Sequence, residues 1–186
     1  MKALAALLIA GLAGCTSLLP RSESSTADTW GDYESAAAAI ERIIPLQTTR
    51  SELQAQGIDP RKNAAITILT FSDVALRFQT GGAIRAEELD PGVRQCLTAG
   101  KACSGYAIAL KRTLNRRIGN FWLDSFNFRR ETDSTGWSFN AIILLTGDLV
   151  VYTLHGGQPR MHETAVERNP LGPLQSWGEQ VPGLLQ

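Results

Sequence analysis

Few side chains in this sequence are suited to covalent or acid–base chemistry. The chain has three cysteines, Cys15, Cys96 and Cys103, and two histidines, His155 and His162. The thiolate is the nucleophilic and metal-binding form of cysteine. Imidazole is the side chain that most readily transfers protons near neutral pH. The surroundings of these five residues therefore decide which chemistries are open to the chain.

Cys15 follows a segment that is typical of an export signal. Lys2 supplies a positive charge, and residues 3–12 are apolar, a stretch too short for a membrane span of about 20 residues. The sequence Leu12-Ala13-Gly14-Cys15 resembles the lipobox of bacterial lipoproteins, in which the cysteine thiol takes up diacylglycerol. This resemblance implies a signal peptide over residues 1–14, cleavage between Gly14 and Cys15, and acylation of Cys15. The alternative is an ordinary secretory signal with an incidental cysteine.

The same resemblance implies a location. A mature lipoprotein carries two or three acyl chains, which anchor it firmly, whereas one chain binds a membrane only marginally. Thr16, rather than aspartate, follows the cysteine. In sorting systems of the enterobacterial type this favours the outer membrane over the inner membrane, with the protein facing the periplasm.

The composition of the mature chain argues against several partners. Removing residues 1–14 leaves 172 residues and takes away one basic side chain, so 17 basic side chains face 18 acidic ones. Nucleic-acid binding requires a basic surface, which this balance does not predict. A polybasic patch for anionic lipid is not predicted either.

Cys96 and Cys103 form the remaining pair of thiols. In an oxidising compartment their spacing predicts a disulfide that closes a loop of eight residues. A metal site is the alternative, but the two histidines lie far away in the sequence, so we expect no metal and no cofactor.

Catalytic motifs are not evident. The sequence has no Gly-x-Ser-x-Gly elbow and no phosphate-binding glycine loop, and Gly156-Gly157 is better explained as a turn. Asp124 lies between aromatic residues, where a carboxylate either has a perturbed pKa or pairs with Arg117 or Arg129. We therefore expect a protein that is not an enzyme. An enzyme with a site near His155 or Asp124 is the less favoured alternative.

The mature chain divides into a tether, a domain and a tail. The polar segment 15–31, which begins with the lipidated cysteine, predicts a flexible tether. Residues 32–168 predict one α+β domain. Residues 169–186, rich in proline and glycine, predict a tail without regular structure, in which Leu171, Leu174 and Trp177 are available to pin it across the sheet.

Start signals predict three short helices in the first half of the domain. Asp32 precedes an apolar helical stripe over 33–44. Thr49-Arg50-Ser51-Glu52 fits a capping box, and Gly57 is placed to end that helix. Asp90-Pro91 begins the third helix. A strand over 65–71 and a helical turn over 72–78 lie between the second and third helices.

Alternating apolar residues predict strands in the second half of the domain, over 105–110, 121–130, 137–145 and 149–154. Turns are expected at 132–136 and 146–148, and the last strand is expected to end at His155-Gly156-Gly157. The predicted fold is α+β, with short N-terminal helices packed on a three- to four-stranded antiparallel meander.

The order of these elements resembles the SmpA/OmlA (BamE-like) family of outer-membrane lipoproteins. The local match is the segment 46–57 followed by Pro60, together with the closing strand 147–152. Gln47 replaces the family's glycine, and the segment 72–104 is additional. The resemblance implies a non-catalytic envelope protein that works by binding, in assembly or maintenance of the outer membrane. It assigns no binding residue.

The aromatic segment 121–128 is the candidate contact surface. Read as a strand, it places Trp122, Phe126 and Phe128 on one face and Phe121 and Leu123 on the other. Helices are expected to cover one face of the meander only, so the second face meets either the rest of the chain or an envelope partner. A periplasmic ligand-binding or inhibitor module on the same scaffold is a further alternative.

Overall fold

The computed structural model describes residues 19–26, 29–78 and 86–172. The predicted signal peptide (1–14), the cleavage site at Gly14 and the acylated Cys15 lie outside these residues, as do Leu174 and Trp177 of the tail. Among the helices in the described ranges, none is long and apolar enough to span a bilayer.

The fold is α+β, as predicted, with several short helices packed on a five-stranded, mostly antiparallel sheet. Two 3₁₀ turns, Ala86–Glu88 and Gly100–Ala102, flank the last helix before the long strands. The elements are β1 (Arg21–Ser25), α2 (Tyr33–Glu41), α3 (Arg50–Ala55), β2 (Ile66–Leu69), α4 (Phe71–Phe78), α5 (Pro91–Thr98), β3 (Cys103–Ile118), α6 (Phe121–Ser125), β4 (Arg129–Thr146) and β5 (Leu149–Arg168).

The order of hydrogen-bonded strands is β1-β3-β4-β5, and β2 also pairs with β3. The β2–β3 pairing is antiparallel, with Ile66 opposite Ile108 and Leu69 opposite Gly105. Strands joined by short connections pair most readily with their neighbours in the sequence, which explains the β3-β4-β5 meander.

The chain forms two compact units. We call Ser24–Arg112 together with Gly136–Met161 the core unit. We call Met1–Glu23, Thr113–Thr135 and His162–Gln186 the hairpin unit, since its described part is built mainly on the β3–α6–β4 hairpin.

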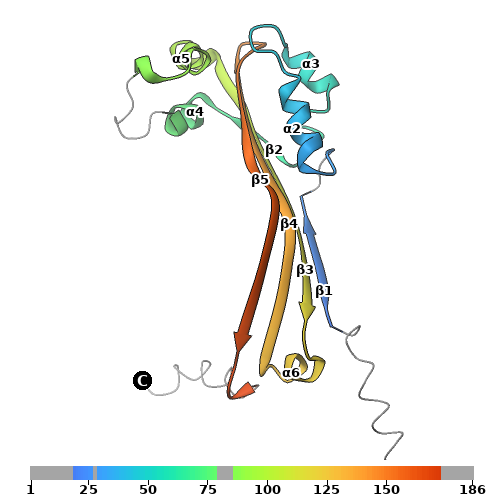
Figure 1. The fold of residues 1–186 in the computed structure, drawn as a ribbon. Helices are drawn as coiled ribbons and strands as arrows, with labels where there is room; N and C mark the ends of the chain where they lie inside the picture. The colour runs from blue at the N-terminus through green and yellow to red at the C-terminus, as the bar shows by residue number, and fades with distance from the viewer. Residues whose placement is uncertain (1–18, 27–28, 79–85, 173–186) are drawn as a thin grey trace, which may run out of the picture. The chain divides into compact units, whose positions relative to one another are not determined.

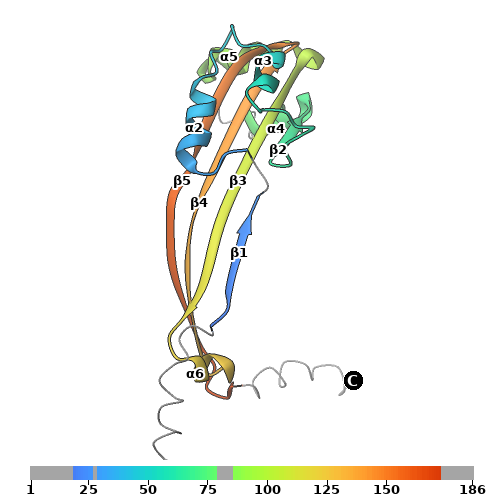
Figure 2. The ribbon, with the colours of Figure 1, turned by 90° about the vertical axis from the view of Figure 1, so that its right-hand side faces the viewer.

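Helices cover both faces of the sheet in the core unit, so the prediction that they cover only one face was wrong. Figure 1 shows α2 and α3 on one side of the strands and α4 and α5 on the other. Figure 2 shows α2 and α3 in front of the strands. The second face is covered because the segment 72–104 supplies most of a second helical layer, α4 and α5.

Strand β4 shows how the sequence supports two cores. Phe139, Ala141, Ile143 and Leu145 belong to the hydrophobic cluster under α2 and α3. Leu144, which points the other way because side chains alternate along a strand, belongs to the cluster that contains Val74 of α4 and Val93 of α5. A strand that is apolar on both faces is expected in a sheet that is covered on both sides.

The predicted helix caps are present. The Asp32 carboxylate accepts from the Ser35 N–H at 2.7 Å, and Glu52 accepts from the Thr49 N–H at 2.7 Å. Asp90 accepts from the Gly92 N–H at 2.8 Å at the start of α5. The first helix ends at Glu41, three residues earlier than predicted.

Two predicted strand ends are wrong. The predicted turn over 132–136 is continuous strand within β4, because Asp133 contacts His162 and Thr164 across the sheet. The last strand does not end at His155-Gly156-Gly157 but continues to Arg168. Gly157, at φ 140°, lets its backbone lie against the Ser138 carbonyl, where a Cβ would collide, so it permits close strand packing rather than a turn.

Part of the predicted tether is a strand. Residues 21–25, within the segment 15–31, form β1 along the edge of β3. The Thr26 N–H donates to the Lys111 carbonyl at 3.1 Å, and the Arg117 N–H donates to the Pro20 carbonyl at 3.2 Å. The polar tether sequence forms this strand because the edge of β3 leaves backbone groups that require partners.

Candidate interaction surface

The aromatic segment of the hairpin unit forms helix α6 over Phe121–Ser125, so the strand predicted over 121–130 is wrong except at Arg129 and Arg130, where β4 begins. The Asn120 side chain accepts from the N–H groups of Trp122 and Leu123 at 2.9 and 3.3 Å and so caps α6. Asn127, at φ 57°, ends the turn, and the Phe128 N–H donates to the Leu123 carbonyl at 2.8 Å. Figure 1 shows α6 between the end of β3 and the start of β4.

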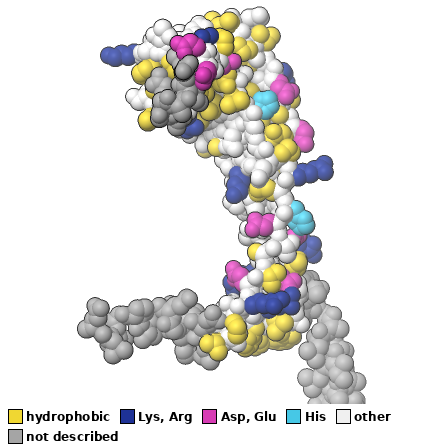
Figure 3. All heavy atoms as spheres, turned by 60° about the vertical axis from the view of Figure 1, so that its left-hand side comes forward, with side chains coloured by type: hydrophobic (Ala, Val, Ile, Leu, Met, Phe, Trp, Pro, Cys, Tyr) yellow, Lys and Arg dark blue, Asp and Glu magenta, His cyan; other side chains and the backbone are white. Residues whose placement is uncertain are grey.

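Folding this segment as a helix brings its apolar side chains into one exposed group. We call Trp122, Leu123, Phe126 and Phe128 the aromatic cluster; their exposed fractions are 48%, 42%, 52% and 43%. The rings of Trp122 and Phe126 stack with centroids 6.1 Å apart. In Figure 3 hydrophobic side chains gather at one end of the hairpin unit, with basic side chains beside them. Two of the three predicted contact residues, Trp122 and Phe126, therefore lie together, and the third, Phe128, is bonded through its backbone to Leu123. The strand prediction places Leu123 on the opposite face.

A buried carboxylate holds α6 in place. Asp124 is 6% exposed, and its two oxygens accept from Arg117 Nη1 at 2.9 and 3.1 Å. Arg130 Nε lies 3.5 Å from the same carboxylate, and Arg130 Nη1 lies 3.5 Å from Glu167. Of the two arginines proposed from the sequence, Arg117 is the partner, whereas Arg129 pairs with Glu131. Asp124 thus ties α6 to β3 and β4.

The C-terminal segment meets the cluster at one position. The Asn169 N–H donates to the Phe128 carbonyl at 2.9 Å. Gly172 is buried, and a Cβ there would lie 2.7 Å from the Phe128 ring. This contact covers one edge of Phe128 but leaves the cluster exposed to the extent given above, and Leu171 beside it is 65% exposed.

The two histidines are in different units and are paired with carboxylates. His155 Nε2 lies 3.6 Å from Glu41 in the core unit, and its ring stacks on Phe139 with centroids 5.8 Å apart. His162 Nε2 lies 2.6 Å from Asp133 in the hairpin unit. In both histidine–carboxylate contacts the side chains are at least partly exposed. The residues that the structure describes include no group of three metal-binding side chains.

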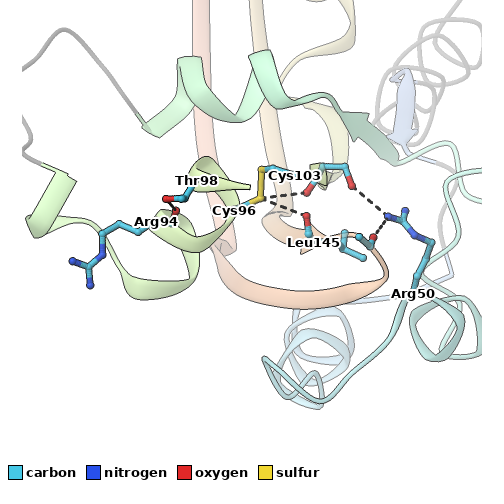
Figure 4. Close-up of a disulfide and its surroundings, with 8 residues drawn as sticks. Arg50, Arg94, Cys96, Thr98, Cys103 and Leu145 are labelled. Atoms are coloured by element: carbon cyan, nitrogen blue, oxygen red, sulfur yellow. Dashed lines mark hydrogen bonds between the residues drawn. A yellow bond between two sulfur atoms is a disulfide. The ribbon is translucent and has the colours of Figure 1, made fainter. Parts of the chain in front are cut away.

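Cys96 and Cys103 are joined by a disulfide in the core unit, with their Cα atoms 4.8 Å apart (Figure 4). Both cysteines are buried, and Cys96 Sγ lies 3.5 Å from the Leu145 carbonyl oxygen. Arg50 fastens the neighbouring strands: it donates to the Tyr106 hydroxyl at 2.7 Å and to the Gly147 carbonyl at 2.9 Å. These groups stabilise the fold rather than present reactive atoms.

Two hollows lie in the surface of the core unit. One, of about 360 Å³, is bordered by Pro45, Leu46, Gln95 and Tyr152, and the other, of about 330 Å³, by Asn140, Leu154 and His155. Ligand pockets combine apolar walls with several convergent polar groups. The larger hollow also borders the polar side chains of Asp90 and Thr153, whereas glycine and apolar residues make up most of the wall of the smaller one. The aromatic cluster differs from both hollows because it exposes several large apolar side chains at once, so it is the candidate surface that we develop.

The sequence contains a helix-start signal for α6, but the strand pattern of the following aromatic residues is stronger. Gly119 and Asn120 precede the segment, and Asn is a preferred N-cap residue. Alternating aromatic residues favour a strand, and this alternation is the basis of the strand prediction. The helical reading places Trp122 and Phe126, four residues apart, on one face.

Comparison of the chain with protein-family models, curated proteins and solved structures finds no match.

Proposed function

We propose that the chain is a lipoprotein of the bacterial envelope, anchored by acyl chains on Cys15, that acts through non-catalytic contacts in assembly or maintenance of the outer membrane. The observation that carries the proposal is the aromatic cluster: exposed apolar rings in and directly after α6, a helix whose buried Asp124 pairs with Arg117. Monomeric proteins seldom expose large apolar groups together unless they bind something.

Three further features support this function. The sequence Leu12-Ala13-Gly14-Cys15 resembles a lipobox. The resemblance to the SmpA/OmlA family rests on the order of two helices and a meander, and the structure has α2 and α3 followed by β3, β4 and β5. Of the candidate catalytic groups, Asp124 pairs with Arg117, and His155 Nε2 lies 3.6 Å from Glu41. The core unit, with two hydrophobic clusters, provides a stable body for such an interaction protein.

Site-specific photo-crosslinking in native envelopes tests the proposal. A benzophenone side chain replaces Phe126 of the aromatic cluster in one variant. In the matched control it replaces Leu76, which is 75% exposed on α4 but lies in the core unit. Mass spectrometry of the intact protein reports acylation of Cys15 in parallel.

We expect acyl chains on Cys15 and a crosslinking yield at least several-fold higher from position 126 than from position 76. Cys15→Ala, which removes the acylation site, should abolish the difference by releasing the protein from its membrane. Equal yields from the two positions would refute the contact surface, and a Cys15 without acyl chains would refute the anchor.

A further inference from the structure

We infer that the aromatic cluster contacts the lipid bilayer that holds the acylated Cys15, so that the protein touches its membrane at two points. This inference rests on the proposed lipid anchor and names the partner of the cluster: the headgroup and upper acyl region of an anionic bilayer. The argument uses only the hairpin unit.

The length of chain between the anchor and the structure limits their separation. Leu19 is the first described residue and lies four residues after Cys15. Four residues span at most about 14 Å when fully extended. The acyl chains therefore attach close to Leu19.

Leu19 in turn lies close to α6. The carbonyl of the next residue, Pro20, accepts from the Arg117 N–H at 3.2 Å. The guanidinium of Arg117 binds Asp124 of α6 at 2.9 Å. This short path of contacts, from Pro20 through Arg117 to Asp124, brings the base of the aromatic cluster near the membrane surface that an acylated Cys15 defines.

The side chains have the chemistry of a membrane interface. Tryptophan and other aromatic side chains favour the headgroup level, where an apolar ring leaves water while polar groups remain hydrated. Trp122 and Phe126 stack on each other and expose about half of their surface. Exposed rings of this kind leave water when they insert shallowly into a bilayer, and this insertion does not require a membrane-spanning helix.

The charge around the cluster fits anionic headgroups. Between residues 116 and 131 there are four arginines and two carboxylates, a net charge of +2, which the pairing of Arg130 with Glu167 reduces to +1. Both carboxylates are already paired, Asp124 with Arg117 and Arg130, and Glu131 with Arg129. Arg116 is exposed and has no ion pair within the described part of the chain. Arginine side chains beside an inserted apolar group reach the phosphates with their guanidinium groups.

Fluorescence quenching by brominated lipid tests the contact. The full acylated protein is reconstituted in phosphatidylcholine vesicles, with or without phosphatidylglycerol, that contain lipid brominated near the top of the acyl chain. The chain has four tryptophans. We compare the wild type with Trp122→Phe and with three matched variants, Trp30→Phe, Trp137→Phe and Trp177→Phe.

We expect quenching in the wild type that increases with phosphatidylglycerol and decreases with salt. Trp122→Phe should remove more than half of the quenching, and each of the other variants should retain most of it. Phenylalanine keeps an apolar ring at position 122, so the fold and the flotation of the vesicles with protein should not change.

Three outcomes would overturn the inference. Loss of quenching in Trp177→Phe rather than Trp122→Phe would assign the contact to the C-terminal segment. Flotation of the acylated protein with no quenching would leave the anchor intact but refute the second contact. A crosslink from position 126 in native envelopes to a protein or a second copy of the chain, and not to lipid, would assign the cluster to that partner. Absence of acyl chains on Cys15 would instead refute the proposed function, on which the inference depends.

Discussion

The core unit and the hairpin unit share β3, β4 and β5 but stabilise them differently. In the core unit, two clusters of buried apolar side chains lie on opposite faces of the sheet. In the described part of the hairpin unit, the only buried residues are Asp124 and Gly172, and most large apolar side chains are exposed. Hydrophobic burial therefore dominates one unit and a charged network the other. The surface that we propose for binding therefore lies in the unit that a charged network stabilises.

The largest expected effect concerns apolar side chains in the two units. Phe139→Ala removes a fully buried ring from the core unit and should lower the free energy of unfolding by about 3–5 kcal/mol. Phe126→Ala removes a ring that is 52% exposed and should cost less than about 1 kcal/mol. Chemical denaturation of both variants measures the difference. Equal losses would show that the hairpin unit has an apolar core after all.

The disulfide should give the next largest effect, confined to the core unit. Replacing both Cys96 and Cys103 by serine opens a loop of eight residues. The loop-entropy relation predicts a loss of about 2.5 kcal/mol. Hydrogen exchange should report weaker protection of α5 and the start of β3, while amides of β4 near Arg129 remain unchanged. An equal loss of protection at Arg129 would show that the two units unfold together.

Asp124→Asn tests the charged network of the hairpin unit. The amide keeps the size of the carboxylate but loses the charge that faces Arg117 and Arg130. Hydrogen bonds to charged groups contribute about 1.5–3 kcal/mol, and we expect a loss near 2 kcal/mol because both arginines are partly exposed to solvent. Faster hydrogen exchange over α6 would show the local effect. Asp133→Asn, at the exposed contact with His162, is the matched control and should change stability by less than about 1 kcal/mol.

The two units also differed in how well the sequence predicted them. In the core unit the caps Asp32, Thr49 and Asp90 were found, because capping depends on side chains only two or three residues away. The second helical layer, α4 and α5, was missed as a layer because covering a sheet face depends on tertiary contacts that no local pattern records. The α+β fold class was predictable because it depends only on the order of helices and strands along the chain.

In the hairpin unit the prediction failed for a different reason. The prediction places Trp122, Phe126 and Phe128 on a strand because their alternation favours strands, whereas the Asn120 cap starts a helix there. Leu123 was consequently missed. The length of β4 and β5 was also underestimated, since the contact of Asp133 with His162 joins residues 29 positions apart in the sequence.

The smallest effect expected is a dependence of stability on acidic pH that arises in the core unit. Hydrogen bonds from the backbone and side chains of Ser35 and Thr49 lower the pKa of Asp32 and of Glu52 from their ordinary values of 3.8 and 4.5. Bonds from Thr70 lower the pKa of Asp73 in the same way. Below pH 4.5 the unfolded chain therefore binds more protons than the folded chain, so folding stability falls as the pH falls through the lowered values. Well above pH 4.5, where the carboxylates are deprotonated in both states, these groups contribute no slope.

Substitution of the caps sharpens this test. Asp32→Asn retains a capping side chain but cannot titrate, so its stability should fall less steeply than that of the wild type between pH 4.5 and pH 2. Glu52→Gln should behave in the same way at α3. Denaturation followed at several pH values, in the core unit by the fluorescence of Trp137, measures the slopes. Because capping groups act on the local helix ends, an acid slope that is identical in the wild type and both variants would show that the acid sensitivity does not arise at these two caps.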